Sequence, residues 1–177
     1  MNIRKSDRIA GLQVIVPDVF HDFRGEFACT FNTTDYRFAD MLGAEIGFVE
    51  DDISVSRRHV LRGLHGDTVT WKLVQCLYGE TYYVVADMRP DSNTYLKWES
   101  FALNERTRMQ VLVPSGCVNG YLTLSDSCVF SYKQSQRYSG GAQQLTVLWN
   151  DAKLGIFWPI QSPILSERDA SARPLDN

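Results

Sequence analysis

The stretch VLRGLHGDTVTWKLV, residues 60–74, places three charge-handling side chains in a segment that otherwise resembles a β-strand. His65 can accept a proton near neutral pH, while Arg62 and Lys72 carry positive charge on either side of it. Charged residues are seldom buried without a partner, so this cluster indicates either satisfied structural residues or a site for chemistry. The position of His65 alone leaves both interpretations open.

Tyr132 is a second candidate. Strand alternation in CVFSYKQ, residues 128–134, puts Tyr132 on the same face as Cys128 and Phe130. Because that face is apolar, we expect Tyr132 to point into the protein interior. A buried tyrosine hydroxyl normally needs a polar partner, so Tyr132 is either a hydrogen-bonded core residue or a proton donor.

Other chemistries have less support. The three histidines, His21, His59 and His65, form no HxH pair, and we expect no metal and no cofactor. The sequence has no GxSxG, Walker or GxGxxG motif. The remaining chemistry that suits His, Tyr and Lys is proton transfer next to a carbonyl, with a base, an acid and a cation that stabilises the enolate.

The elements that must position these residues are predominantly strands. Short alternating or β-branched runs recur along the chain, separated by turn sequences such as PDSN, PSG and SGG. This pattern predicts an all-β sandwich, jelly roll or barrel. One helix is expected at residues 33–42, capped by Thr33 or Thr34. The tail, residues 155–177, holds three prolines and is expected to wrap the barrel irregularly.

The bulk composition limits the function classes. At 177 residues the chain is expected to form one domain, residues 1–177. A net charge of −3 without a basic stripe argues against nucleic acid as a partner. No apolar run is long enough for a membrane helix, and the N-terminus lacks a signal peptide, so a cytoplasmic protein is expected. The four cysteines are interpreted as small buried hydrophobes.

Taken together, nine segments resemble the dTDP-4-dehydrorhamnose 3,5-epimerase family, a metal-free branch of the cupin jelly rolls that acts on nucleotide-linked 4-keto sugars. The resemblance spans nearly the whole chain. In order, the segments are FHDFRGEF (20–27), EDDISVS (50–56), LRGLH (61–65), KLVQCLYGE (72–80), VVADMRPDSNTYLKW (84–98), VPSGCVNGYLTLSD (113–126), FSYKQSQRY (130–138), WNDAKLGIFWP (149–159) and SPILSERD (162–169).

The resemblance implies roles for individual residues. His65 matches the general base, and Asp169 matches the carboxylate that orients it. Tyr132 matches the acid that returns a proton on the opposite face, and Lys72 matches the residue that stabilises the enolate. The resemblance thus implies an epimerase that inverts C3, C5 or both in a 4-keto-6-deoxy sugar.

Substrate binding and assembly are also implied by the family. Arg62 matches a diphosphate contact, and Arg24 lies in a motif that helps to bind the nucleotide. Arg168, in the last motif, is included with the substrate-binding residues. Family members form homodimers through exchanged N-terminal strands, and residues 12–20 would suit such an edge strand.

Several positions depart from the family pattern. Asn119 stands where a histidine is usual, so this catalytic position can donate a hydrogen bond but cannot take up a proton. Glu50 and Asp52 replace the usual amides, and Cys29 replaces a common glutamate. Since a carboxylate accepts hydrogen bonds from the N–H donors of guanine, Glu50 or Asp52 would suit a GDP-linked sugar. Alternatively, these acids face solvent or pair with Arg24.

The short loop with HGD after the base is similar to the branch that epimerises GDP-4-keto-heptoses for surface polysaccharides. Asn119 is expected to mark an enzyme that inverts a single centre. Two other functions stay open: a nucleotide-sugar 3,4-ketoisomerase, and a non-catalytic sugar-nucleotide-binding cupin. The joint presence of the base, its carboxylate, the acid and the lysine favours an enzyme over a binding protein.

Overall fold

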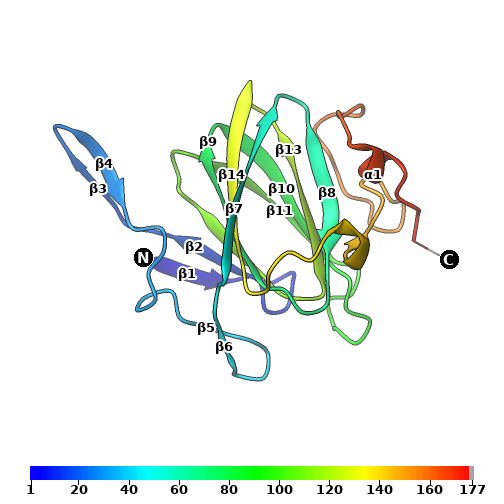
Figure 1. Ribbon diagram of the computed structural model, residues 1–177, viewed down its shortest axis with the longest axis horizontal. Coiled ribbons are helices and arrows are strands. Elements are labelled where there is room, and N and C mark those ends of the chain that lie inside the picture. The colour runs from blue at the N-terminus through cyan, green and yellow to red at the C-terminus, as the bar shows by residue number, and fades with distance from the viewer. Residues whose placement is uncertain (176–177) are drawn as a thin grey trace.

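The computed structural model describes residues 1–175, which fold into two antiparallel sheets that face each other (Figure 1). The six-stranded sheet has the order β1 (Asn2–Lys5), β2 (Gln13–Val16), β12 (Gln110–Val113), β9 (Lys72–Tyr78), β14 (Ser127–Gln134) and β7 (Glu50–Arg57). The five-stranded sheet has the order β11 (Trp98–Asn104), β10 (Glu80–Asp87), β13 (Cys117–Thr123), β8 (Leu61–Gly66) and β15 (Leu145–Thr146). This is the all-β jelly-roll architecture expected from the sequence.

The main core lies between the two sheets. Val74 of β9 and Phe130 of β14 pack in one buried cluster with Tyr83 and Val85 of β10. The alternate residues of β10, Val84 and Ala86, belong to a second buried cluster on the outer face of the smaller sheet. Because β10 is covered on both faces, it has a continuous hydrophobic run rather than strict alternation.

The C-terminal tail covers that outer face, as expected. Leu154, Ile156 and Trp158 are buried in the second cluster, and the Trp158 indole donates to the Trp149 carbonyl over 2.7 Å. A single parallel bridge joins Ile164 to Val60 at the start of β8. The tail therefore holds its last segment against the strand that carries His65.

The expected helix at residues 33–42 is wrong. The segment forms turns and then β5 (Phe38–Ala39), which pairs with β6 (Glu45–Ile46). The Asn32 side chain accepts hydrogen bonds from the amides of Thr34 and Asp35 at 2.9 and 2.8 Å. Asp40 does the same for two amides in the following turn. These local bonds compete with helix formation, which is why Asn and Asp favour turns.

The chain has instead one α-helix among the described residues, the single turn α1 (Glu167–Ala170), and a 3₁₀ turn, η1 (Gly141–Gln143). Ser166 caps α1, since its hydroxyl accepts from the Asp169 amide over 3.2 Å. The helix thus fixes the position of Asp169.

One hairpin lies outside the two sheets. The hairpin of β3 (Val19–Asp22) and β4 (Gly25–Ala28) projects away from the sheets (Figure 1), and its residues Phe20, Phe23 and Phe27 are exposed.

Three of the four cysteines, Cys76, Cys117 and Cys128, are buried free thiols, as expected. Cys29 is exposed because it directly follows this projecting hairpin. Within the described part of the chain, no helix is long and apolar enough to cross a membrane.

Candidate active site

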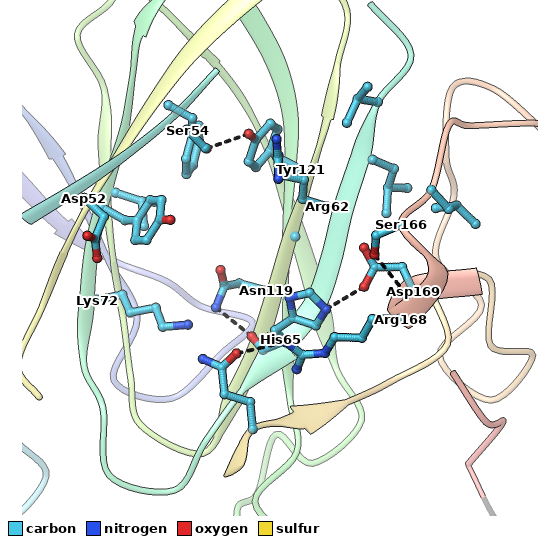
Figure 2. A pocket seen from close by; sticks show the side chains of 18 of the residues that line it. Asp52, Ser54, Arg62, His65, Lys72, Asn119, Tyr121, Ser166, Arg168 and Asp169 are labelled. Carbon is cyan, nitrogen blue, oxygen red and sulfur yellow. Dashed lines mark hydrogen bonds and ion pairs between the residues drawn. The ribbon is translucent and has the colours of Figure 1, made fainter. Parts of the chain in front are cut away.

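A cavity of about 560 Å³ opens between the two sheets (Figure 2). Its walls come from β7, β9 and β14 of the larger sheet, from β8 and β13 of the smaller sheet, and from the segment around α1. The cavity contains eight of the ten residues singled out from the sequence, all except Glu50 and Arg24: Asp52, Arg62, His65, Lys72, Asn119, Tyr132, Arg168 and Asp169.

His65 and Asp169 form a close pair. Nε2 of His65 lies 2.5 Å from Oδ1 of Asp169, whose side chain is only 3% exposed (Figure 2). Burial alone raises the pKa of Asp169, but the hydrogen bond from His65 and the donors on Ser166 and Gly63 outweigh it. The pKa of Asp169 therefore lies below its usual range, and the carboxylate stays ionised. This arrangement keeps a proton on Nε2 and leaves Nδ1 as the acceptor that can take a proton from a substrate.

Asn119 supports His65 from the neighbouring strand. The two residues are cross-strand partners, and the Asn119 amide donates to the His65 carbonyl oxygen over 3.0 Å. Gly63 makes this close approach of β8 and β13 possible, because a Cβ at Gly63 would lie 2.6 Å from the Cα of Gly120. Asn119 thus holds the backbone that carries His65.

Lys72 enters the cavity from the opposite sheet. The residue is 8% exposed and lines the cavity, and its ammonium has no hydrogen bond or ion pair among the described residues. Burial lowers the pKa of Lys72; the charge of Asp67 opposes this shift and the charge of Arg168 adds to it. A buried cation without a protein partner is suited to stabilising negative charge on a ligand.

Tyr132 lies on β14, in the same sheet as Lys72. It lines the cavity and packs against the main core, which confirms the expected inward orientation. Burial raises the pKa of Tyr132, and the nearby Asp52 carboxylate raises it further. The phenol therefore remains protonated at neutral pH and can act as an acid. His65 and Tyr132 thus approach the cavity from opposite sheets.

Two arginines add positive charge to the cavity. Arg62 donates from Nε to the Ser56 hydroxyl over 2.9 Å and from Nη2 to the Val55 carbonyl over 3.3 Å. Arg168 donates from Nε and Nη2 to the Thr146 hydroxyl at 2.9 and 2.6 Å. Arg168 also donates from Nη1 to Oε1 of Gln144 over 3.4 Å, so Arg62 is held along one edge of its guanidinium and Arg168 through all three of its nitrogens. The cavity thus combines fixed cations with His65.

The two acids considered for base recognition are in different situations. Asp52 lines the cavity, and one of its oxygens accepts from the Gln134 amide over 3.0 Å. Both carboxylate oxygens of Glu50 accept from the backbone amide of Tyr138 at 3.1 Å, and Glu50 itself does not line the cavity. Glu50 therefore tethers the segment after β14, a role that the sequence did not indicate.

Arg24 is not part of this cavity in its own chain. It lies in the turn of the projecting hairpin, where its guanidinium pairs with Asp22 at 2.5 Å. Within one chain, therefore, neither Glu50 nor Asp52 pairs with Arg24. Among the described residues, no group of three or more His, Cys, Asp or Glu side chains is arranged to hold a metal ion.

The structure also reveals a residue that sequence reasoning missed. Tyr121 of β13 lines the cavity, and its hydroxyl lies 2.8 Å from the Ser54 hydroxyl and 2.9 Å from that of Ser56. Alternation along residues 50–57 could have placed both serines on the inner face of β7. No sequence pattern, however, shows which tyrosine on another sheet they meet.

Comparison with known proteins supports the same interpretation of the whole chain. The family model described as dTDP-4-dehydrorhamnose 3,5-epimerase matches residues 6–177. An enzyme of that name from Salmonella typhimurium is 38% identical over 172 residues, covering 95% of this chain and 92% of the relative.

Solved structures agree in fold. A dTDP-6-deoxy-D-glucose 3,5-epimerase from Legionella pneumophila, in complex with dTDP-4-keto-L-rhamnose, has a TM-score of 0.88 at 33% identity and covers 98% of this chain and 92% of its own. A 3'-monoepimerase from Streptomyces bikiniensis, in complex with dTDP-quinovose, has a TM-score of 0.84 at 28% identity, with 93% and 83% coverage. The chain therefore belongs to the dTDP-4-dehydrorhamnose 3,5-epimerase family.

Proposed function

We propose that this protein epimerises a 4-keto-6-deoxy sugar carried on a nucleoside diphosphate. The observation that carries the proposal is the pairing of His65 with Asp169 in one cavity that also holds Tyr132 and Lys72 from the opposite sheet. The names of the relatives, which are epimerases of dTDP-linked sugars, support the same activity.

The ketone at C4 makes the hydrogens on C3 and C5 acidic. Nδ1 of His65 removes one of these protons, and Asp169 stabilises the imidazolium that results. The electron pair moves onto the C4 oxygen as an enolate, which the Lys72 ammonium stabilises. Tyr132 then donates its proton to the opposite face of the same carbon, the enolate returns to the ketone, and the centre is inverted. Solvent reprotonates Tyr132 and removes the proton from His65.

The diphosphate is expected to lie against Arg62. Its guanidinium lines the cavity and is bonded to protein along only one edge, so it can still donate to phosphate oxygens. Arg168, on the side of His65 and Asp169, supplies a second fixed cation.

A homodimer would complete the nucleotide site. The projecting hairpin exposes three phenylalanines next to Arg24, and an isolated hairpin of this kind needs a surface to cover it. We propose that the hairpin of one copy packs against the other copy and brings Arg24 to its partner's cavity.

For the nucleotide base, Asp52 remains the candidate that would favour guanine. One of its carboxylate oxygens is bonded to Gln134, and the other is not engaged by any described residue. Glu50 is not among the residues that line the cavity and is held by the Tyr138 amide, so we propose Asp52 alone as the acid that meets guanine. The curated relatives carry dTDP in their names, so the two nucleotides must be compared directly.

Asn119 bears on the number of centres inverted. Its amide is committed to the His65 carbonyl and cannot act as a second base, so we propose inversion at one carbon. The similarity to a 3'-monoepimerase is consistent with such an outcome.

The test is incubation in deuterated buffer with dTDP- and GDP-linked 4-keto-6-deoxy sugars, hexoses and heptoses, followed by NMR of the ring protons. Deuterium at C3 alone or C5 alone, with inversion there, supports the proposal, and incorporation at both carbons would overturn the single-centre part. The His65→Asn variant is the control and should lose exchange. A product with the ketone at C3 would identify a 3,4-ketoisomerase, and binding without exchange would identify a binding protein.

A further inference from the structure

A series of hydrogen bonds through two buried hydroxyl groups holds Arg62 along one edge of its guanidinium. Ser56 and Tyr121 are 4% and 5% exposed, and their hydroxyl oxygens lie 2.9 Å apart. The Ser56 hydroxyl in turn accepts the Nε–H of Arg62 over 2.9 Å. This series of hydrogen bonds runs from Tyr121 on β13 to Ser56 on β7 and then to Arg62 on β8. Strands β8 and β13 are neighbours, and Arg62 is the cross-strand partner of Tyr121.

The tyrosine at the end of this series of hydrogen bonds is itself fixed. The ring of Tyr121 stacks on Phe130 with centroids 4.3 Å apart and an interplanar angle of 18°. Its hydroxyl is also bonded to Ser54, so it cannot turn away without leaving a buried polar group unpaired. A fixed Tyr121 therefore fixes Ser56, and a fixed Ser56 fixes the Nε edge of Arg62.

The bonds that Arg62 makes leave a defined set of donors free. A guanidinium has five N–H groups; Nε–H goes to Ser56, and one N–H of Nη2 goes to the Val55 carbonyl. The other three have no partner among the described residues, and Arg62 lines the cavity. The protein contacts thus select which edge of the planar group is presented to a ligand, which matters for bidentate recognition of phosphate.

We propose that Ser56 and Tyr121 are positioning residues for substrate binding, which orient Arg62 so that its free edge meets the diphosphate of the nucleotide sugar. This inference rests on the proposed function, in which Arg62 contacts the diphosphate. It adds that affinity depends on two residues that do not themselves touch the phosphate.

Ser54 provides a matched control. Like Ser56, it lies on β7 and bonds to the Tyr121 hydroxyl, but it makes no hydrogen bond to Arg62. Ser54→Ala and Ser56→Ala therefore remove the same group from neighbouring inward positions of one strand. Only the second change breaks the path to the guanidinium, because without the Ser54 hydroxyl the Tyr121 ring is still stacked on Phe130 and its hydroxyl is still bonded to Ser56.

The experiment is calorimetric titration of each variant with dTDP and GDP, and with thymidine and guanosine as ligands without phosphate. We expect Ser56→Ala to weaken binding of the preferred diphosphate about tenfold, as for loss of a hydrogen bond to a charged group. Nucleoside binding should not change, Ser54→Ala should stay within about twofold, and Ser56→Thr should restore affinity. In steady-state kinetics the loss should appear in KM, with kcat little changed.

A double-mutant cycle with Arg62→Ala tests whether Ser56 and Tyr121 influence diphosphate affinity through Arg62. In the Arg62→Ala background, Ser56→Ala and Tyr121→Phe should cause no further loss of diphosphate affinity. Equal losses in both backgrounds, or a lower unfolding temperature with unchanged affinity, would overturn the positioning role. If Arg62→Ala itself does not weaken diphosphate binding, the placement of the diphosphate in the proposed function fails instead, whether or not the enzyme turns over its substrate.

Discussion

Asp169 acts on His65 in two ways that can be separated by substitution. In the proposed mechanism its carboxylate holds the Nε2 proton, and its charge stabilises the imidazolium after proton transfer. An asparagine at this position keeps the size of the side chain and removes the charge. We expect Asp169→Asn to lower kcat by about 10²- to 10⁴-fold, measured as deuterium exchange into the substrate.

Glu167→Gln is the matched control, because it removes a carboxylate from the exposed face of the same helical turn. It should leave kcat within about twofold. If both substitutions lowered kcat equally, the effect would come from disturbing α1 and not from the charge beside His65.

Lys72 should determine the alkaline limb of the pH profile. Burial lowers its pKa below the value of about 10.4 that is typical of an exposed lysine, whereas the pKa of Tyr132 is raised. In the proposed mechanism both groups act in their protonated forms. Burial moves the loss of the Lys72 proton to lower pH and that of the Tyr132 proton to higher pH, so we predict that Lys72 sets the alkaline limb. kcat/KM should stay level while Lys72 is charged and fall as the pH passes through its lowered pKa.

Lys72→Arg tests this assignment, since a guanidinium does not lose its proton in this range. The variant should be less active, with its alkaline limb moved to higher pH. An unmoved limb would show that another group titrates there. The comparison needs only kcat/KM between about pH 7 and 11 for the two proteins.

Most of the candidate residues could be chosen from the sequence as neighbours in space, because the segments that resemble the family contain them in order. Eight of the ten do line one cavity. Glu50 and Arg24 do not, for physical reasons that a single sequence hides. The partner of Glu50 is a backbone amide 88 residues away, and Arg24 lies on a hairpin that leaves its own barrel.

At the scale of elements, strands were predictable and the helix was not. Strands such as β10 and β14 follow from β-branched and aromatic runs with alternating or continuous burial. The segment 33–42 has apolar residues at helical spacing, but Asn32 and Asp40 cap local turns instead. The one short helix lies in the tail, where its function is to hold Asp169.

The contact of Glu50 with the Tyr138 amide should slow amide hydrogen exchange in the segment that joins β14 to β15, residues 135–144. This segment carries Tyr138 and Gln144 to the cavity wall, and Glu50 holds it through the Tyr138 amide. We expect Glu50→Ala to increase amide hydrogen exchange in residues 135–144 about tenfold and to raise KM. The measurement is hydrogen exchange followed by mass spectrometry.

Asp126→Ala is a suitable control, because its side chain is 96% exposed and lies away from this segment. It should leave exchange in residues 135–144 unchanged. A Glu50→Ala variant with normal exchange and an altered preference between dTDP and GDP would contradict the tether and return Glu50 to base recognition.

At the scale of the whole molecule, one segment of the single chain has an exposed apolar surface that the rest of the chain does not cover. The cavity lies between its two sheets, yet the hairpin of β3 and β4 stands apart from them (Figure 1), and Phe20, Phe23 and Phe27 are exposed. Arg24 sits in the turn of that hairpin. If two copies exchange hairpins, each cavity depends on residues from both chains, and the parts can be supplied by different mutants.

Mixing the inactive His65→Asn and Arg24→Ala proteins tests this directly. In a mixed dimer, the cavity with an intact His65 receives an intact Arg24 from its partner, so one cavity of two is active. Random exchange makes half of the dimers mixed, and activity should therefore return to about one quarter of the unmutated level. If Arg24 acts within its own chain, no mixed cavity is complete and activity stays at the level of the separate mutants. A monomeric protein by light scattering would contradict the exchange altogether.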